Sequence, residues 1–176
     1  MIDRAEITVG YLHACGDLET FLALAGDAEL RSRSAGTRWT NEELLFHMVF
    51  GYMVTRRLLP LVKCFGRLPP SVGNAFAGLL DAGTKPFDWV NYWGSWAASR
   101  VYNRHRMARK LRRVTTTLAA NLETESHASL GLQMAFPTRW DPFFRPVMTV
   151  ADLYAYPTKH FAFHAQQLSF LPHTPE

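Results

Sequence analysis

The sequence has few cysteines and no apolar run long enough to cross a membrane. Its 176 residues include two cysteines, Cys15 and Cys64, which form no CxxC pair. We therefore expect neither a disulfide framework nor a zinc knuckle. Cys15 lies on the apolar stripe of the first expected helix, which predicts a buried structural thiol. The longest apolar stretch, residues 39–54, is too short to span a bilayer and contains His47, so no membrane partner is expected.

The sequence also lacks an alternating strand pattern and a basic start followed by an apolar run. These absences favour an all-α protein without a signal peptide, which we expect in the cytoplasm. Hydrophobic residues make up 48% and charged residues 19%, which is an ordinary globular composition. The length fits a single domain over residues 1–176. The net charge of +4 is too small to imply nucleic acid, and no nucleic-acid partner is predicted.

Apolar residues recur at helical spacing in four long segments. The expected helices cover about residues 3–25, 40–60, 86–122 and 149–170. Capping-box patterns support two of the starts: Thr40 with Glu43, and Thr149 with Asp152. A short helix is expected near residues 75–81 in the first long connection, while the second long connection is rich in proline. This pattern predicts a four-helix bundle with two long connections.

Three histidines lie on the apolar stripes of these helices. His160 and His164 are four residues apart, so they share one face of the last helix. His47 lies on the apolar face of the second helix, where Gly51 leaves space one turn later. A single inward histidine is best interpreted as a core residue with a hydrogen-bond partner. A buried polar group without such a partner costs about 1–3 kcal/mol, and these apolar stripes offer few partners for three imidazoles. One divalent metal would satisfy all three imidazoles, so we predict a metal site.

The remaining histidines lie off these stripes. We predict that they are surface residues: His13, His105, His127 and His173.

The two histidine segments carry recognisable motifs. Residues 39–47 read W-T-x-x-E-L-L-x-H, and residues 160–167 read H-x-x-x-H-x-x-Q. Over nearly its whole length, the chain resembles the DinB/YfiT-like superfamily of metalloenzymes. The resemblance implies a four-helix bundle that binds a divalent metal, most often zinc or nickel, through His47, His160 and His164. It also implies that Gln167 supports the site or packs beside it. Pro157 departs from the pattern and predicts either a kink or a later start of the ligand helix.

The resemblance also implies a reaction class. Several characterised relatives are S-transferases or isomerases that use a low-molecular-weight thiol such as mycothiol or bacillithiol, and in arginine-rich actinobacterial proteins the implied cosubstrate is mycothiol. No catalytic side chain is predicted, because the nucleophile would be a thiolate or a water held at the open metal position. The expected partners are therefore a small-molecule thiol and an electrophilic substrate. The alternatives are a metal-dependent hydrolase and a non-catalytic metal-binding stress-response module.

The third expected helix carries tryptophans and arginines on one stripe. Trp89, Trp93 and Trp96 predict core packing, with the wall of a substrate pocket as the alternative. Arg100 and Arg104 fall on the same stripe, and an inward arginine needs an anionic partner. That partner is either an internal carboxylate or an acidic substrate. We therefore regard Arg100, Arg104 and Trp96 as candidate cofactor- or substrate-binding residues.

The second expected helix is apolar on its other side as well. The residues there are Leu45, Phe46, Val49, Tyr52 and Met53. A helix that is hydrophobic all round must be covered on more than one side. A homodimer through the second helix would supply this cover, and the long connections of the same chain are the alternative.

Overall fold

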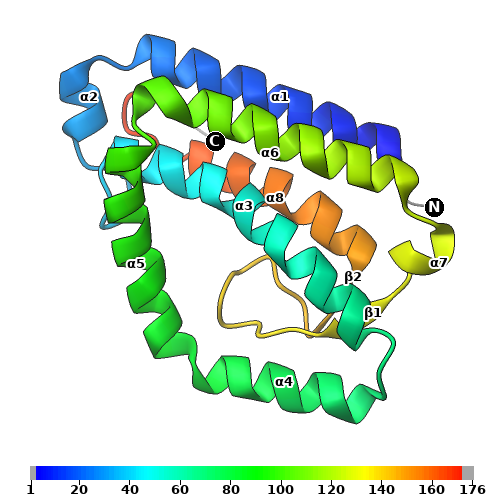
Figure 1. Cartoon of the computed structure of the whole chain (residues 1–176). Coiled ribbons are helices and arrows are strands. Elements are labelled where there is room, and N and C mark those ends of the chain that lie inside the picture. The colour runs from blue at the N-terminus through cyan, green and yellow to red at the C-terminus, as the bar shows by residue number, and fades with distance from the viewer. Residues whose placement is uncertain (1–2, 172–176) are drawn as a thin grey trace, which may run out of the picture.

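Four helices form the body of the molecule (Figure 1). The computed structural model describes residues 3–171, without the side chains of residues 85–88, 90, 91 and 98. The helices of this body are α1 (Arg4–Leu24), α3 (Asn41–Phe65), α6 (Arg104–Thr124) and α8 (Val150–Ala165). Helix α1 packs against α6 and α8, and α3 packs against the same two helices, so the four close into a ring. The predicted all-α fold is confirmed.

Side chains cap the helix starts as the sequence patterns indicate. The Thr40 hydroxyl accepts a hydrogen bond from the Glu43 amide, and the Glu43 carboxylate accepts one from the Thr40 amide at 2.9 Å. Thr149 and Asp152 form the same box at the start of α8. These bonds satisfy amides that have no partner inside the helix, so they fix where α3 and α8 begin. Helix α8 runs through Pro157 without ending there.

The third predicted helix is two helices in the structure. Helix α5 (Thr84–Val101) ends before Tyr102, and α6 begins after Asn103, whose side chain accepts a hydrogen bond from the His105 amide. The prediction of one continuous helix over residues 86–122 is therefore wrong. Because the helical phase restarts at this cap, residues before and after Asn103 do not share a stripe.

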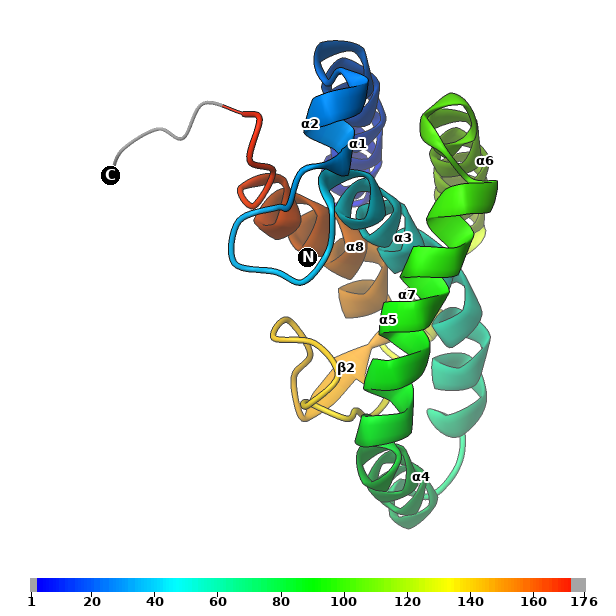
Figure 2. The ribbon, with the colours of Figure 1, turned by 90° about the vertical axis from the view of Figure 1, so that its left-hand side faces the viewer.

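Helix α5 leaves the bundle at this break and meets α4 (Pro70–Ala82) at its other end. Figures 1 and 2 show both helices in green as an arm beside the bundle. Helix α4 begins at Pro70, earlier than the short helix expected near residues 75–81. Trp89, Trp93 and Trp96 are 65%, 43% and 36% exposed. The prediction that they form core is wrong, since α5 carries them away from the bundle.

A short β-hairpin lies before α8, where no strand was predicted. Strand β1 (Gln133–Ala135) pairs antiparallel with β2 (Val147–Thr149), and Met134 lies opposite Met148. Residues 3–171 also form two further short helices, α2 (Asp27–Arg31) and α7 (His127–Leu130). The hairpin brings both ends of the loop over residues 136–146 close to the start of α8. That loop reaches the functional site described below.

Helix α3 is covered within one chain. It contacts α8, α6, α5, α2 and β1, and four of the five apolar residues on its other side are buried there: Leu45, Phe46, Val49 and Tyr52. The cover that a homodimer was expected to supply thus comes from the chain's own elements. A homodimer stays an untested expectation, and those residues would not form its surface. No helix in the described part of the chain is long and apolar enough to cross a membrane.

Candidate metal centre

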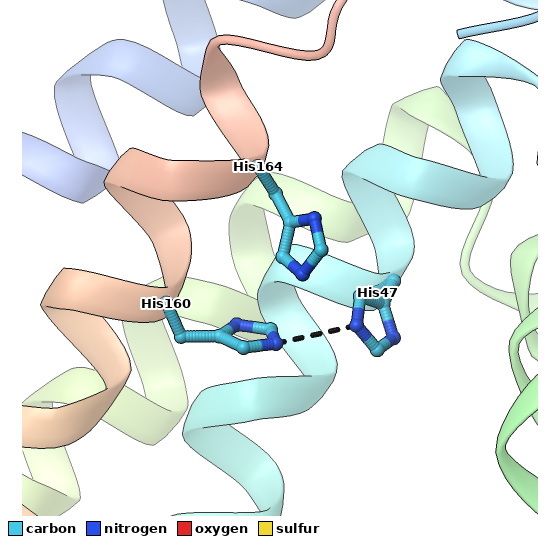
Figure 3. Close-up of side chains that lie close together, drawn as sticks. All are labelled: His47, His160 and His164. Carbon is cyan, nitrogen blue, oxygen red and sulfur yellow. Dashed lines mark hydrogen bonds between the residues drawn. The ribbon is translucent and has the colours of Figure 1, made fainter. Parts of the chain in front are cut away.

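The structure brings His47, His160 and His164 together. His47 projects from α3, while His160 and His164 project from successive turns of α8, and the three imidazoles face one another (Figure 3). Their potential ligand atoms all lie within 4.8 Å of one another. The Nε2 atoms of His47 and His160 are 3.2 Å apart. The inward phasing predicted from helical spacing is confirmed for all three residues.

Burial favours the neutral form of these imidazoles by lowering their pKa values. His47 is 7% exposed and His160 is 2% exposed. Burial, with a smaller effect of His164, lowers the pKa of His47 to about 3. Burial also lowers the pKa of His160, with further contributions from His47 and His164. The pKa of His164 is lowered by burial too, although Gln167 and Asp141 oppose the shift. A neutral imidazole is the form that binds a metal, because its free nitrogen carries a lone pair.

Gln167 orients His164. The Nδ1–H of His164 donates a hydrogen bond of 2.7 Å to Gln167 Oε1, just after the end of α8. With the proton held on Nδ1, the lone pair of His164 is on Nε2. Ligating histidines commonly use the second nitrogen in this way, which fixes the tautomer and the ring orientation. This contact gives Gln167 the supporting position that the sequence resemblance implied.

Trp39 and Gly51 shape the space around the rings. The centroids of the Trp39 and His47 rings are 4.3 Å apart, and Tyr92 of α5 stacks on Trp39 with centroids 6.4 Å apart. Gly51 lies against His160, since a Cβ atom there would be 2.7 Å from His160 Nδ1. The aromatic residues therefore hold the His47 ring in place, and the absence of a side chain at Gly51 leaves room for the His160 ring.

A cavity of about 190 Å³ opens beside the histidines. Its wall is largely aromatic and aliphatic, with Asp141 as the one carboxylate among the described lining residues. The lining residues are Trp39, His47, Phe50, Gly51, Val54, Trp140, Asp141, Pro142, Phe144, Tyr156, His160 and His164. The cavity thus places an apolar space directly against the three imidazoles.

Sequence reasoning missed two polar residues of this site, Asp141 and Tyr156. Asp141 comes from the loop between β1 and β2, and its Oδ2 is 3.6 Å from His160 Nε2. The Tyr156 hydroxyl donates a 2.7 Å hydrogen bond to the same oxygen. Burial raises the pKa of Asp141, although the Phe143 amide, Tyr156 and His164 oppose the shift. Tyr156 lies four residues before His160 on α8, and that helical spacing was the available signal for it.

The residues present fit a divalent metal. Nε2 of His47 and Nε2 of His160 face each other, and the hydrogen bond of His164 Nδ1 to Gln167 leaves the Nε2 lone pair of His164 free. Two nitrogens bound to one ion at about 2.1 Å can be no more than about 4.2 Å apart. The 3.2 Å separation of the His47 and His160 Nε2 atoms meets this limit. The three ligand atoms lie within 4.8 Å of one another, so a small rotation of a ring would bring all of them within it. Neutral imidazoles beside a buried carboxylate suit zinc, nickel, iron or copper.

The other predicted binding residues lie elsewhere. Arg104 pairs with Asp27 of α2 at 2.9 Å and donates to the Leu22 carbonyl oxygen at 3.0 Å. Arg100 is exposed and lies over the Trp96 ring at 3.5 Å. The prediction that both face the core on one stripe is wrong, because the break at Asn103 separates them. None of Trp96, Arg100 and Arg104 lines the histidine cavity, and their binding of a substrate stays untested.

The remaining histidines and the cysteines are also placed. His13, His105 and His127 are exposed as predicted, and His173 lies outside the described residues. Cys15 is half-buried rather than fully buried, and its Sγ is 3.4 Å from Thr115 Oγ1. Cys64 is exposed.

The fold and the site together define a helical protein with a largely buried three-histidine centre suited to a divalent metal. The family comparison agrees: the chain belongs to the DinB superfamily, whose family model matches residues 13–168. No curated protein and no solved structure gives a significant match to the chain.

Proposed function

We propose that this protein is a metal-dependent enzyme that transfers a low-molecular-weight thiol, of the mycothiol type, to a small electrophile. The observation that carries the proposal is the position of three imidazoles, two buried and one half-buried, at the edge of an apolar cavity. His47, His160 and His164 would hold the ion, with zinc or nickel as the expected metals. Three protein nitrogens leave room for a further ligand, which is typical of catalytic rather than structural sites.

The metal would supply thiol activation. A divalent ion lowers the pKa of a thiol that binds to it, so that thiolate, the nucleophilic form, is present near neutral pH. The chain's own residues position and shield that chemistry. Gln167 holds the His164 ring, while Trp39, Phe50, Trp140 and Phe144 line the space beside the histidines and exclude water.

The cavity favours a small, uncharged electrophile. At about 190 Å³ it is smaller than typical ligand pockets of roughly 300–1,000 Å³, so it can hold a reacting group but not a whole mycothiol molecule. Its described lining contains no lysine or arginine, and the Asp141 carboxylate would repel an acidic group. An electrophile gripped by Arg100 or Arg104 is therefore not part of this proposal.

A conjugation assay tests the proposal. Metal-loaded protein is incubated with mycothiol and either chlorodinitrobenzene or a carboxylate-bearing analogue of it. We expect transfer that depends on metal and thiol and that is faster with the uncharged electrophile. The His47→Ala variant should lose this activity, whereas a Cys15→Ser/Cys64→Ser variant should keep it, because neither cysteine lines the cavity.

Three results would count against this function. Full transfer by His47→Ala shown to be free of metal would exclude activation by the ion. Turnover of an ester substrate without any thiol would indicate a hydrolase instead. Metal binding without turnover, together with unfolding on metal removal, would indicate a non-catalytic metal-binding module.

A further inference from the structure

We propose that Asp141 supplies a fourth protein ligand to the divalent metal, so that the centre consists of three imidazoles and one carboxylate and a thiol would bind as a fifth ligand. This inference rests on the metal centre of the proposed function. It concerns a loop residue outside the two helices that carry the histidines.

The loop holds the Asp141 carboxylate at the site. Its side chain is 10% exposed, and Oδ1 accepts a 2.9 Å hydrogen bond from the Phe143 amide. Oδ2 accepts the hydrogen bond from Tyr156 and faces His160. The short β-hairpin anchors both ends of this loop. Asp141 is thus aimed at the histidines by its own loop and by α8.

The hydrogen bonds that this carboxylate accepts bring it no cationic partner. The Phe143 amide and the Tyr156 hydroxyl are both neutral donors. None of the described residues that line the cavity is lysine or arginine. Buried charges in proteins are normally paired with an opposite charge or coordinate a metal. A divalent cation among the three imidazoles would supply the missing positive charge.

The ring nitrogen of His160 that Asp141 faces shows whether Asp141 is a metal ligand or a residue that only orients His160. A carboxylate that only orients a ligating histidine binds the N–H on the far nitrogen of the ring. Here that far nitrogen is Nδ1, which lies against Gly51. Asp141 Oδ2 instead lies 3.6 Å from Nε2, the nitrogen that also faces His47 Nε2 at 3.2 Å. Both separations are below the roughly 4.2 Å that two ligands of one ion can span.

The test compares Asp141→Asn with Glu123→Gln. Asparagine keeps the size of the side chain and an oxygen that can accept from Tyr156, but it removes the charge. Glu123 is exposed near the end of α6, does not line the cavity, and gives the same change in net charge. Zn²⁺ affinity is measured by competition with a chelator, and Co²⁺ binding by visible absorption, whose pattern reports the ligand set. Circular dichroism verifies folding, and Asp141→Ala serves as a second variant.

We expect Asp141→Asn to weaken Zn²⁺ binding by more than about 100-fold, beyond the 10–100-fold typical of supporting residues. The Co²⁺ absorption should change as well, whereas Glu123→Gln should match wild type in both measurements. A wild-type Co²⁺ spectrum in both Asp141 variants would overturn the inference. Absence of metal binding by wild type would overturn the metal centre and this inference together. Normal metal binding without thiol transfer would refute only the proposed reaction.

Discussion

Gly51 of α3 lies directly against the imidazole of His160 on α8. A Cβ atom at position 51 would be 2.7 Å from His160 Nδ1 and 3.1 Å from Cε1 of the same ring. Carbon and nitrogen atoms in contact are normally about 3.5–4.0 Å apart, so only glycine admits the ring in its present position. The close packing of these two helices and the position of a metal ligand therefore depend on the same residue.

Gly51→Ala should weaken metal binding and destabilise the fold. The added methyl group must displace His160 or separate α3 from α8, and overpacking of this kind costs about 1–3 kcal/mol. Thermal unfolding and Zn²⁺ competition measure the two effects. The matched control is Gly16→Ala, because a Cβ on Gly16 of α1 meets nothing within 4 Å. That change should stabilise the protein by about 0.5–1 kcal/mol through helix propensity. Equal melting temperatures for the two variants would contradict the steric argument.

Loss of the Gln167 side-chain oxygen should weaken metal binding without large loss of stability. Methionine at position 167 keeps a similar length but cannot accept the proton from His164 Nδ1. Removal of such a support typically lowers metal affinity by about 10–100-fold. Gln166→Met is the control, because Gln166 is the exposed neighbour. If both variants bind Zn²⁺ as tightly as wild type, the His164–Gln167 bond does not orient a ligand.

Helical spacing was sufficient to predict the three histidines but not the rest of the site. His47, His160 and His164 lie within long amphipathic helices whose starts are fixed by local capping, so their inward phase follows from the sequence. Asp141 lies in a loop whose position depends on two strands of three residues each. Such short strands show no period, and the contact of the loop with α8 is a tertiary effect.

The break between α5 and α6 was missed for a related reason. Apolar residues continue through the region, with neither glycine nor proline between Ser95 and Arg104 to mark an end. The signal was Asn103, a residue that favours helix N-caps and that forms the cap of α6. Treating residues 86–122 as one helix placed Arg100 and Arg104 on a common stripe. The prediction that both arginines face the core depended on that helical phase and is wrong, while their binding of an acidic substrate stays untested.

The metal-free protein should lose stability as the pH falls below about 6.5. His47 has its pKa lowered to about 3 by burial, and the pKa of His160 and the pKa of His164 are lowered as well. In the unfolded chain these groups regain ordinary pKa values and bind protons that the folded state excludes. Stability is therefore fully present above the unfolded pKa and declines as the pH falls toward the folded pKa. One such histidine accounts for about 1.4 kcal/mol by about pH 5.5.

Urea unfolding with a chelator present measures this dependence. The free energy of unfolding of wild type should fall more steeply between about pH 7.5 and about pH 5.5 than that of His47→Gln, by roughly the contribution of one histidine. Glutamine carries no proton that titrates in this range. Parallel curves for the two proteins would show that His47 is not held neutral by burial.

The two cysteines should differ in reactivity, and neither should be needed for transfer. Burial raises the pKa of Cys15, although Thr115 and Arg112 partly oppose the shift. Cys64 is exposed. Since thiolate is the reactive form, iodoacetamide at about pH 8 should modify Cys64 at least about 10-fold faster than Cys15. The rate at Cys15 should still be rising above about pH 9, as expected of a thiol with a raised pKa. Peptide mass analysis of samples quenched over time measures both rates.

The same alkylated protein shows whether the nucleophilic sulfur belongs to the thiol cosubstrate or to a cysteine of the protein. If the nucleophile arrives with the thiol cosubstrate, metal-loaded protein with Cys64 fully modified should transfer mycothiol at a near-normal rate. The Cys15→Ser/Cys64→Ser variant is the control, because it carries no cysteine and its rate cannot be affected by partial modification at Cys15. Loss of transfer in both preparations, with metal content unchanged, would mean that a protein thiol takes part in the reaction. Because neither cysteine lines the histidine cavity, we expect both preparations to remain active.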